Sequence, residues 1–168
     1  FIMQLFYSFG LKQMVILDVI IIAAGFVLRA VSGAVALQVP FTAWLVVCIF
    51  SLCLFMGFCK RYNETAVLSA EHKVSHRQSL LEYTQPLLAM LITVSATLAI
   101  VSFMLYSISE RTIASFGTSA FIYTVPVVIY CVFRFAAMSM DGRYDGPADL
   151  VIKDIPLISG VVIWIALA

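Results

Sequence analysis

The chain has 168 residues, of which 63% are apolar and only 11% are charged, and its formal net charge is +1. Its mean hydropathy is +1.07. A water-soluble domain needs far more polar surface, so the composition excludes that class and indicates an integral membrane protein. The net charge gives no indication of a nucleic-acid partner, and none is expected.

Several apolar segments are long enough, or nearly so, to cross a bilayer as helices, because a span needs about 20 residues. Inside lipid each backbone group must pair within its own segment, and the two-residue alternation of a barrel strand is absent. The expected spans are 14–36, 41–59, 84–108, 117–136 and 151–168. The predicted fold class is therefore all-α, a polytopic transmembrane helix bundle, with residues 1–168 forming one transmembrane domain.

Both ends of the chain lie inside apolar runs. Residues 1–8 are expected to be the end of a preceding span, and the chain is expected to be a piece of a longer protein. Pro86 and Pro156 stand near the starts of their expected helices, where a missing N–H costs little. Pro126 lies in the middle of an expected span and should kink that helix.

The polar connections fall into two sets that alternate along the chain: 8–13, 60–83 and 137–150 on one side of the membrane, and 37–41 and 109–116 on the other. The first set and its borders hold the basic residues Lys12, Lys60, Arg61, Lys73, Arg77, Arg134, Arg143 and Lys153, whereas the second set holds Arg111. Lys and Arg accumulate on the cytoplasmic side of membrane proteins, so the first set is predicted to be cytoplasmic.

The longest polar run is the predicted cytoplasmic loop 60–83. Its part AVLSAEHKVSHRQSLLEY, residues 66–83, has the pattern of an amphipathic helix that lies on the membrane surface or covers a cavity mouth. His72 and His76 are four residues apart, but the glutamate of an HExxH zinc motif is not between them, so no zinc site is predicted.

Two charges, Asp18 and Arg29, lie within the first complete span. Charges at membrane depth are costly and normally face a partner or a wet cavity. They are three turns apart on one helix face, too far to pair with each other. Each therefore either pairs with a neighbouring helix and locks the bundle, or lines a polar cavity. For Asp18 the cavity is favoured, because the residue is only a turn or so from the cytoplasmic Lys12.

Cations and carboxylates crowd the predicted cytoplasmic face. Such a ring suits a phosphorylated substrate, because cations bind phosphate oxygens and carboxylates hold a divalent metal, typically Mg²⁺, against a diphosphate. The alternative is an ordinary positive-inside loop with no ligand. The residues concerned are Tyr7, Lys12, Lys60, Arg61, Asn63, Glu64, Arg134, Asp141, Arg143, Asp145, Asp149, Lys153 and Asp154.

A resemblance to a known family makes the prediction of a phosphorylated substrate more specific. The stretches YSFGLKQMVILDVIIIAAGFVLRAVSGA, GFCKRYNE, SLLEYT, FRF and GPADLVIKDIPL together resemble the second half of a UbiA-superfamily membrane transferase, and most closely its decaprenyl-phosphate phosphoribosyltransferase branch. The resemblance covers nearly the whole chain. It implies a helix bundle around a central cavity, in a bacterial cell (inner) membrane, to which this chain would contribute the C-terminal part.

The implied reaction moves a phosphoribosyl group from phosphoribosyl diphosphate to polyprenyl phosphate, for cell-wall arabinan precursors, with Mg²⁺ assisting departure of the diphosphate. The superfamily's first aspartate-rich motif, which binds the metal, is expected upstream of Phe1, so this piece is not expected to be active alone. The second motif, a DxxxD in prenyl-transferring relatives, is replaced here by KRYNE. This departure disfavours an aromatic acceptor.

The resemblance also implies site residues. Tyr7 and Lys12 correspond to a diphosphate grip, Lys60, Arg61 and Glu64 to the second-motif loop, Asp18 and Arg134 to charged positions of this branch, and Asp154 to the acidic start of the last helix. The predicted catalytic residues are Lys60, Arg61, Glu64 and Asp18. The predicted phosphate-binding residues are Tyr7, Lys12, Lys60, Arg61 and Arg134, and Glu64 and Asp154 are secondary candidates for metal ligands.

Other readings remain open. A UbiA-type polyprenyltransferase with an aromatic acceptor shares the fold and the isoprenoid substrate. A transporter fragment would use Asp18, Arg29 and Pro126 along a permeation path, and would need polar residues through the whole membrane thickness. A non-catalytic membrane bundle, and assembly into an oligomer, are also compatible with the sequence.

Overall fold

The structure is a computed structural model that describes residues 16–39, 41–71, 83–117, 119–142 and 147–167. These residues form helices and no strand, so the all-α prediction is confirmed for the described part of the chain. The elements in order are α2 (Leu17–Ala36), α3 (Ala43–Glu71), α5 (Gln85–Ser107), α6 (Glu110–Phe116), the 3-10 helix η2 (Ala120–Thr124), α7 (Val125–Met140), α8 (Pro147–Lys153) and α9 (Ile155–Leu167).

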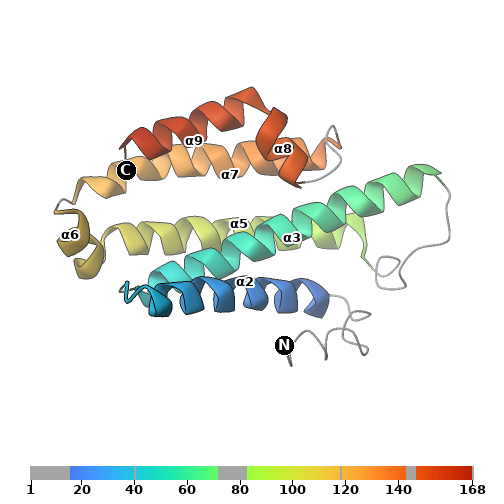
Figure 1. The fold of residues 1–168 in the computed structure, drawn as a ribbon. Coiled ribbons are helices and arrows are strands. Elements are labelled where there is room, and N and C mark those ends of the chain that lie inside the picture. Colours follow the sequence, from blue (N-terminus) through green and yellow to red (C-terminus); the bar gives the residue numbers. More distant parts are fainter. Residues whose placement is uncertain (1–15, 40, 72–82, 118, 143–146, 168) are drawn as a thin grey trace.

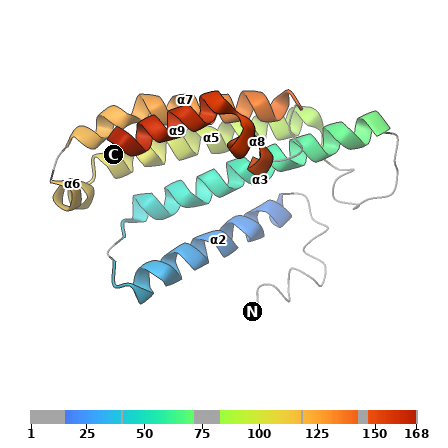
Figure 2. The same ribbon diagram turned by 45° about the horizontal axis from the view of Figure 1, so that its top comes forward.

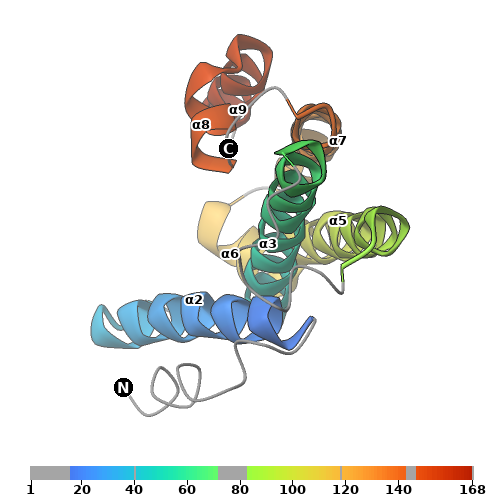
Figure 3. The same ribbon diagram turned by 90° about the vertical axis from the view of Figure 1, so that its right-hand side faces the viewer.

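The long helices run back and forth along the bundle (Figure 1), and α2 crosses the direction of α5 and α7 obliquely (Figure 3). The start of α2, the end of α3, the start of α5 and the end of α7 lie at the same end of the bundle, next to α8 (Figures 1 and 2). Helix α3 packs against α2, α5, α7 and α8, and α9 packs against α7. Viewed along the bundle, α2 and α9 are at opposite edges, with α3, α5 and α7 between them (Figure 3).

Four of the predicted spans are confirmed as helical segments long and apolar enough to cross a membrane: Leu17–Ala36, Ala43–Ala66, Gln85–Ser107 and Ala120–Met140. The last predicted span, 151–168, is divided instead into α8 and the 13-residue α9. Asp154 stands at this break, and its carboxylate accepts a hydrogen bond of 3.0 Å from the Leu157 N–H in the first turn of α9. A side chain that caps the new helix in this way favours a fresh start over a continuous span.

Residues 60–71 differ from the predicted loop, because α3 continues through them to Glu71. The stretch KRYNETAVLSAE contains neither Gly nor Pro. Glu64 is three and four residues after Arg61 and Lys60 and forms ion pairs with both, which stabilises the helix. The rest of the expected amphipathic helix, with His72 and His76, lies outside the described residues.

Two prolines begin helices as predicted, and one differs. Pro86 is in the first turn of α5, where the Thr84 hydroxyl accepts from the Leu87 N–H at 3.4 Å, and Pro156 is in the first turn of α9. Pro126 does not kink a span, because it also stands at a helix start, that of α7, directly after η2. The first turn of a helix needs no intrahelical N–H donor, so proline fits there without a kink.

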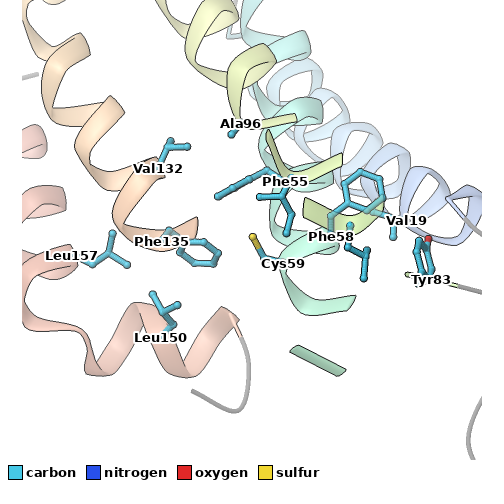
Figure 4. Close-up of a cluster of buried hydrophobic side chains, with 12 residues drawn as sticks. Val19, Phe55, Phe58, Cys59, Tyr83, Ala96, Val132, Phe135, Leu150 and Leu157 are labelled. Atoms are coloured by element: carbon cyan, nitrogen blue, oxygen red, sulfur yellow. The ribbon is translucent and has the colours of Figure 1, made fainter. Parts of the chain in front are cut away.

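A cluster of buried apolar side chains joins α2, α3, α5, α7, α8 and α9 (Figure 4). The rings of Phe55 and Phe135 connect α3 to α7 with centroids 5.4 Å apart. Helix α2 approaches α3 closely at Gly57, where an added Cβ would lie 2.5 Å from a methyl carbon of Val19. Small residues at such crossings allow membrane helices to pack closely.

Candidate functional site

A buried ion pair connects the start of α2 to the second half of α3. Asp18 is 0% exposed and Arg61 is 5% exposed. The Arg61 Nε donates to Asp18 Oδ2 at 3.0 Å, and one terminal nitrogen of the guanidinium lies 2.9 Å from the same oxygen in an ion pair. Of the two alternatives for Asp18, pairing with a neighbouring helix is therefore the one observed.

Tyr83, directly before α5, is another hydrogen-bond partner of Asp18. Its hydroxyl donates to Asp18 Oδ1 at 2.8 Å and accepts from the Ile16 N–H at 2.6 Å. The Val19 N–H also donates to Oδ1, at 2.8 Å. Burial raises the pKa of the Tyr83 hydroxyl, which keeps the phenol protonated and able to donate.

Glu64 extends this network to the surface. The second terminal nitrogen of Arg61 donates to Glu64 Oε2, and the Lys60 ammonium lies 3.8 Å from Glu64 Oε1. The Lys60 side chain is 59% exposed and the Glu64 side chain 32% exposed. Arg61 thus lies between two carboxylates inside the bundle, whereas Lys60 is accessible from outside it.

A second ion pair joins α7 to the start of α9. The Arg134 guanidinium donates to both carboxylate oxygens of Asp154, at 3.0 and 2.8 Å. Asp154 is only 3% exposed, and the Arg134 side chain is 31% exposed. Bidentate pairs of this geometry fix the relative orientation of two elements, so this contact holds α9 against α7.

Among the predicted site residues, Asp18, Lys60, Arg61 and Glu64 form one continuous network, and Arg134 pairs with Asp154 in a separate contact. Both groups belong to the same end of the bundle, where α3 and α7 end (Figure 1). Tyr7 and Lys12 lie outside the described residues. Arg29 is exposed on α2, with its guanidinium 5.5 Å from the centre of the Phe26 ring.

Tyr83 is the site residue that the sequence reasoning missed. It belongs to the stretch SLLEYT, which carried part of the resemblance, but nothing local distinguishes it from the other tyrosines of the chain. Its partners Ile16 and Asp18 are 67 and 65 residues away in sequence. A contact between residues so far apart depends on how the helices pack.

The described carboxylates do not fit the divalent cation that the resemblance implies. No group of three or more His, Cys, Asp or Glu side chains suited to a metal occurs among residues 16–39, 41–71, 83–117, 119–142 and 147–167. The two secondary candidates, Glu64 and Asp154, are each bound to arginine. Their oxygens are therefore directed to guanidinium groups and not to a shared cation.

An apolar pocket of about 520 Å³ opens deeper in the bundle. It is surrounded by side chains of α3, α5, α6, η2, α7 and α9. Leu52 lies at its end toward Lys60, and aromatic rings lie at the other end. Phe103, Phe121 and Trp164 form these ring contacts, with centroids 5.7 to 6.5 Å apart. A pocket lined in this way suits a hydrocarbon chain.

No protein-family model matches the chain. Curated proteins with similar sequences are named decaprenyl-phosphate phosphoribosyltransferase. The protein from Mycolicibacterium smegmatis is 32% identical over 169 residues, which cover 96% of this chain and 52% of the relative. Those from Mycobacterium tuberculosis and Corynebacterium glutamicum are 29% and 30% identical, over 98% and 97% of this chain and 53% and 49% of the relative.

The chain thus spans about half the length of the curated relatives that it matches. The similarity extends across every described helix, because it covers nearly all residues of the chain. Together with the apolar helices, it supports a multi-pass membrane protein. This chain is therefore similar, over nearly its whole length, to one half of the decaprenyl-phosphate phosphoribosyltransferases.

Proposed function

We propose that the full-length protein containing this chain transfers a phosphoribosyl group from phosphoribosyl diphosphate to a polyprenyl phosphate such as decaprenyl phosphate. The observation that carries the proposal is the similarity to proteins of that name over 96–98% of the chain. The ion-pair network at one end of the bundle and the apolar pocket below it support the proposal, because the two substrates are one highly charged molecule and one amphiphile.

On the donor side, Lys60 is the most accessible of the described residues predicted to bind phosphate, which are Lys60, Arg61 and Arg134. It is exposed, whereas Arg61 is held between Asp18 and Glu64. Lys60 therefore contacts the diphosphate of the donor in this proposal, and Arg61 and Asp18 fix the helix that presents it. Arg134 remains a proposed contributor to phosphate binding from α7, although its contact with Asp154 already occupies two of its donors.

On the acceptor side, the apolar pocket receives part of the isoprenoid chain. Leu52, at the edge of the pocket, precedes Lys60 by eight residues on α3. At 1.5 Å per residue, the two are separated by about 12 Å along the helix. In this proposal the hydrocarbon chain of an acceptor whose phosphate lies near Lys60 extends along α3 to the pocket, past the apolar cluster of Phe55, Phe58 and Phe135, and so keeps the two reacting groups close together.

The proposed step breaks the bond between ribose C1 and the diphosphate oxygen, and forms a bond between C1 and an oxygen of the acceptor phosphate. Negative charge grows on the leaving diphosphate, and a fixed cation such as Lys60 stabilises it. The acceptor phosphate is already anionic at neutral pH, so a strong general base is unnecessary. No His or Cys nucleophile is needed for the same reason.

Dependence on Mg²⁺ is part of the proposal and rests on the resemblance alone. Its ligands are expected upstream of Phe1, since the described carboxylates do not fit it. The membrane location proposed is the bacterial inner membrane, with the Lys60 end of the bundle in the cytoplasm, and the product would serve cell-wall arabinan synthesis.

The test is a transfer assay on the full-length protein with labelled phosphoribosyl diphosphate, polyprenyl phosphate, and Mg²⁺ or a chelator. We expect label in the lipid product only when Mg²⁺ is present. Lys60→Ala should raise the donor KM by about tenfold or more, as expected from loss of a charged hydrogen bond. Lys153→Ala is the matched control, because Lys153 is also exposed and paired with a carboxylate four residues away.

Three results would contradict the proposal or its donor site. Transfer of a polyprenyl group to an aromatic acceptor, with no phosphoribosyl transfer, would favour the alternative function of a UbiA-type polyprenyltransferase. Absence of any transfer with either donor would favour a non-catalytic or transport role. Equal effects of Lys60→Ala and Lys153→Ala would remove Lys60 from the site while leaving the reaction in place.

A further inference from the structure

Three elements that are distant in sequence meet at one buried carboxylate. Asp18 is at the start of α2, Arg61 is in α3, and Tyr83 stands just before α5. All three residues are at most 5% exposed. Interactions of this kind in a low-dielectric interior are strong when complete and costly when one member is removed.

The Asp18 carboxylate is surrounded by donor groups. A carboxylate offers about four acceptor positions. Oδ1 accepts from the Tyr83 hydroxyl and the Val19 N–H, and Oδ2 accepts from the Arg61 Nε and lies 2.9 Å from one of its terminal nitrogens. Each bond limits the rotation of the carboxylate, so the orientation of the Arg61 guanidinium depends on the Tyr83 hydroxyl through Asp18.

The same guanidinium also contacts Glu64, which connects it to Lys60 at the surface. Its remaining terminal nitrogen donates to Glu64 Oε2, and Glu64 Oε1 faces the Lys60 ammonium at 3.8 Å. A continuous series of contacts therefore leads from Tyr83 through Asp18, Arg61 and Glu64 to Lys60. Its buried end is hydrogen-bonded on both carboxylate oxygens of Asp18, and its exposed end is the Lys60 ammonium that is proposed to bind the diphosphate of the donor.

We propose that Tyr83 is a positioning residue for the phosphate site: its hydroxyl, acting through Asp18, Arg61 and Glu64, holds the Lys60 ammonium in place for a diphosphate. This inference rests on the proposed function for the identity of the donor, but the contacts themselves do not depend on it. The phenol also binds the Ile16 N–H at the entry to α2, so one hydroxyl fixes both the helix start and the carboxylate.

The test uses Tyr83→Phe in the full-length protein, with two separate readouts. The first is the Kd of inorganic diphosphate by equilibrium binding, which needs no turnover. The second is the KM of each substrate in the transfer assay. We expect Tyr83→Phe to weaken diphosphate binding and raise the donor KM by about three- to tenfold, the range for one hydrogen bond, with the acceptor KM within about twofold.

The matched control is Tyr130→Phe, which removes a hydroxyl from an exposed tyrosine on α7. It should leave the diphosphate Kd unchanged. In a Lys60→Ala background, Tyr83→Phe should have no further effect on diphosphate binding, because its influence passes through Lys60. Additive effects of the two substitutions would overturn the inference and reduce Tyr83 to a general stabiliser of the fold.

Lys60→Arg provides a second variant that leaves the buried residues untouched. If the ammonium is held in a fixed position, a longer cation should bind diphosphate at least about threefold more weakly; binding within twofold of wild type would overturn the inference. A wild-type protein that binds diphosphate but transfers nothing would refute the proposed function alone. Normal transfer with unchanged diphosphate binding in Tyr83→Phe would refute the positioning role alone.

Discussion

Asp18 and Arg61 show how a charge is accommodated at the edge of a membrane-spanning helix. Both side chains are almost completely removed from solvent, and the carboxylate has four donors around it. The desolvation of two ions largely offsets their attraction, so such a pair adds little net stability. Substitution of only one of the two residues is costly, however, because the other ion is then buried without its partner.

A double-mutant cycle tests whether Asp18 and Arg61 depend on each other for their contribution to stability. We expect Asp18→Ala and Arg61→Ala each to lower the free energy of unfolding by about 3–5 kcal/mol. The double substitution should cost clearly less than the sum, because neither ion is then left alone. Arg61→Ala is therefore expected to reduce stability as well as donor use, in contrast to Lys60→Ala.

The measurement is thermal or denaturant unfolding of the full-length protein in detergent. Asp149→Ala is the control, because the pair of Asp149 with Lys153 is exposed and should contribute at most about 1 kcal/mol. Strictly additive losses for Asp18 and Arg61 would show that the two side chains stabilise the bundle independently, against the geometry observed.

At the scale of the element, α3 has two distinct ends. Its first half is apolar and lines the pocket, whereas its second half carries the ion pairs of Lys60, Arg61 and Glu64, near the end of the candidate span Ala43–Ala66. Because one straight helix contains both, the distance between the pocket and Lys60 is set by helical rise alone. Helix α9 closes the pocket from the other side with Val161 and Trp164.

The two faces of α9 allow a matched test of the pocket. Val161 lines the pocket, whereas the next residue, Val162, is 57% exposed and does not. We expect Val161→Trp to fill part of the pocket and raise the KM of a long-chain polyprenyl phosphate by about fivefold or more, an effect of about 1 kcal/mol. A short-chain acceptor should be affected less.

The transfer assay with acceptors of two chain lengths measures this effect, and Val162→Trp is the control on the same helix. The assignment of the pocket to the acceptor is contradicted if both variants change the KM equally. It is also contradicted if Val161→Trp changes the KM of the phosphoribosyl donor and not that of the lipid.

At the scale of the whole molecule, basic residues are more numerous at one end of the bundle than at the other. Lys60, Arg61 and Lys153 belong to the end where α3 and α7 finish, while Arg111 lies at the other, in α6 (Figure 1). This asymmetry predicts that the Lys60 end is cytoplasmic. The donor is a soluble phosphorylated metabolite in the proposed reaction, so the same end must face the compartment that supplies it.

Labelling of single cysteines tests this orientation. The four native cysteines lie within predicted spans and are replaced first. Ser115→Cys, in exposed α6, should react with a membrane-impermeant maleimide in intact cells, whereas Lys153→Cys should react only after permeabilisation. The opposite pattern would invert the topology and exclude a cytoplasmic donor site at Lys60.

The sequence by itself determined the class of fold, because hydropathy and the need to pair every backbone group in lipid leave only helices. It also indicated which residues carry charge, and motif resemblance gathered Asp18, Lys60, Arg61 and Glu64 into one site. Local rules predicted the helix starts at Pro86 and Pro156, but the break at Asp154 and the extension of α3 to Glu71 were missed. At Asp154 a capping side chain interrupts an apolar segment, and after Lys60 ion pairs between residues four apart extend a helix into a polar one. The periodicity of apolar residues does not show whether such local interactions or hydropathy sets the helix boundary.

Only the tertiary structure decided which charges meet. Asp18 had two alternatives in the sequence, and its pairing with Arg61 depends on the close crossing of α2 and α3 at Gly57. The roles of Tyr83 as a third partner, and of Arg134 as the partner of Asp154, likewise follow from contacts between elements. Hydropathy is a property of each segment and can be read along the chain, whereas an ion pair across helices depends on the relative rotation and depth of both, which packing alone fixes.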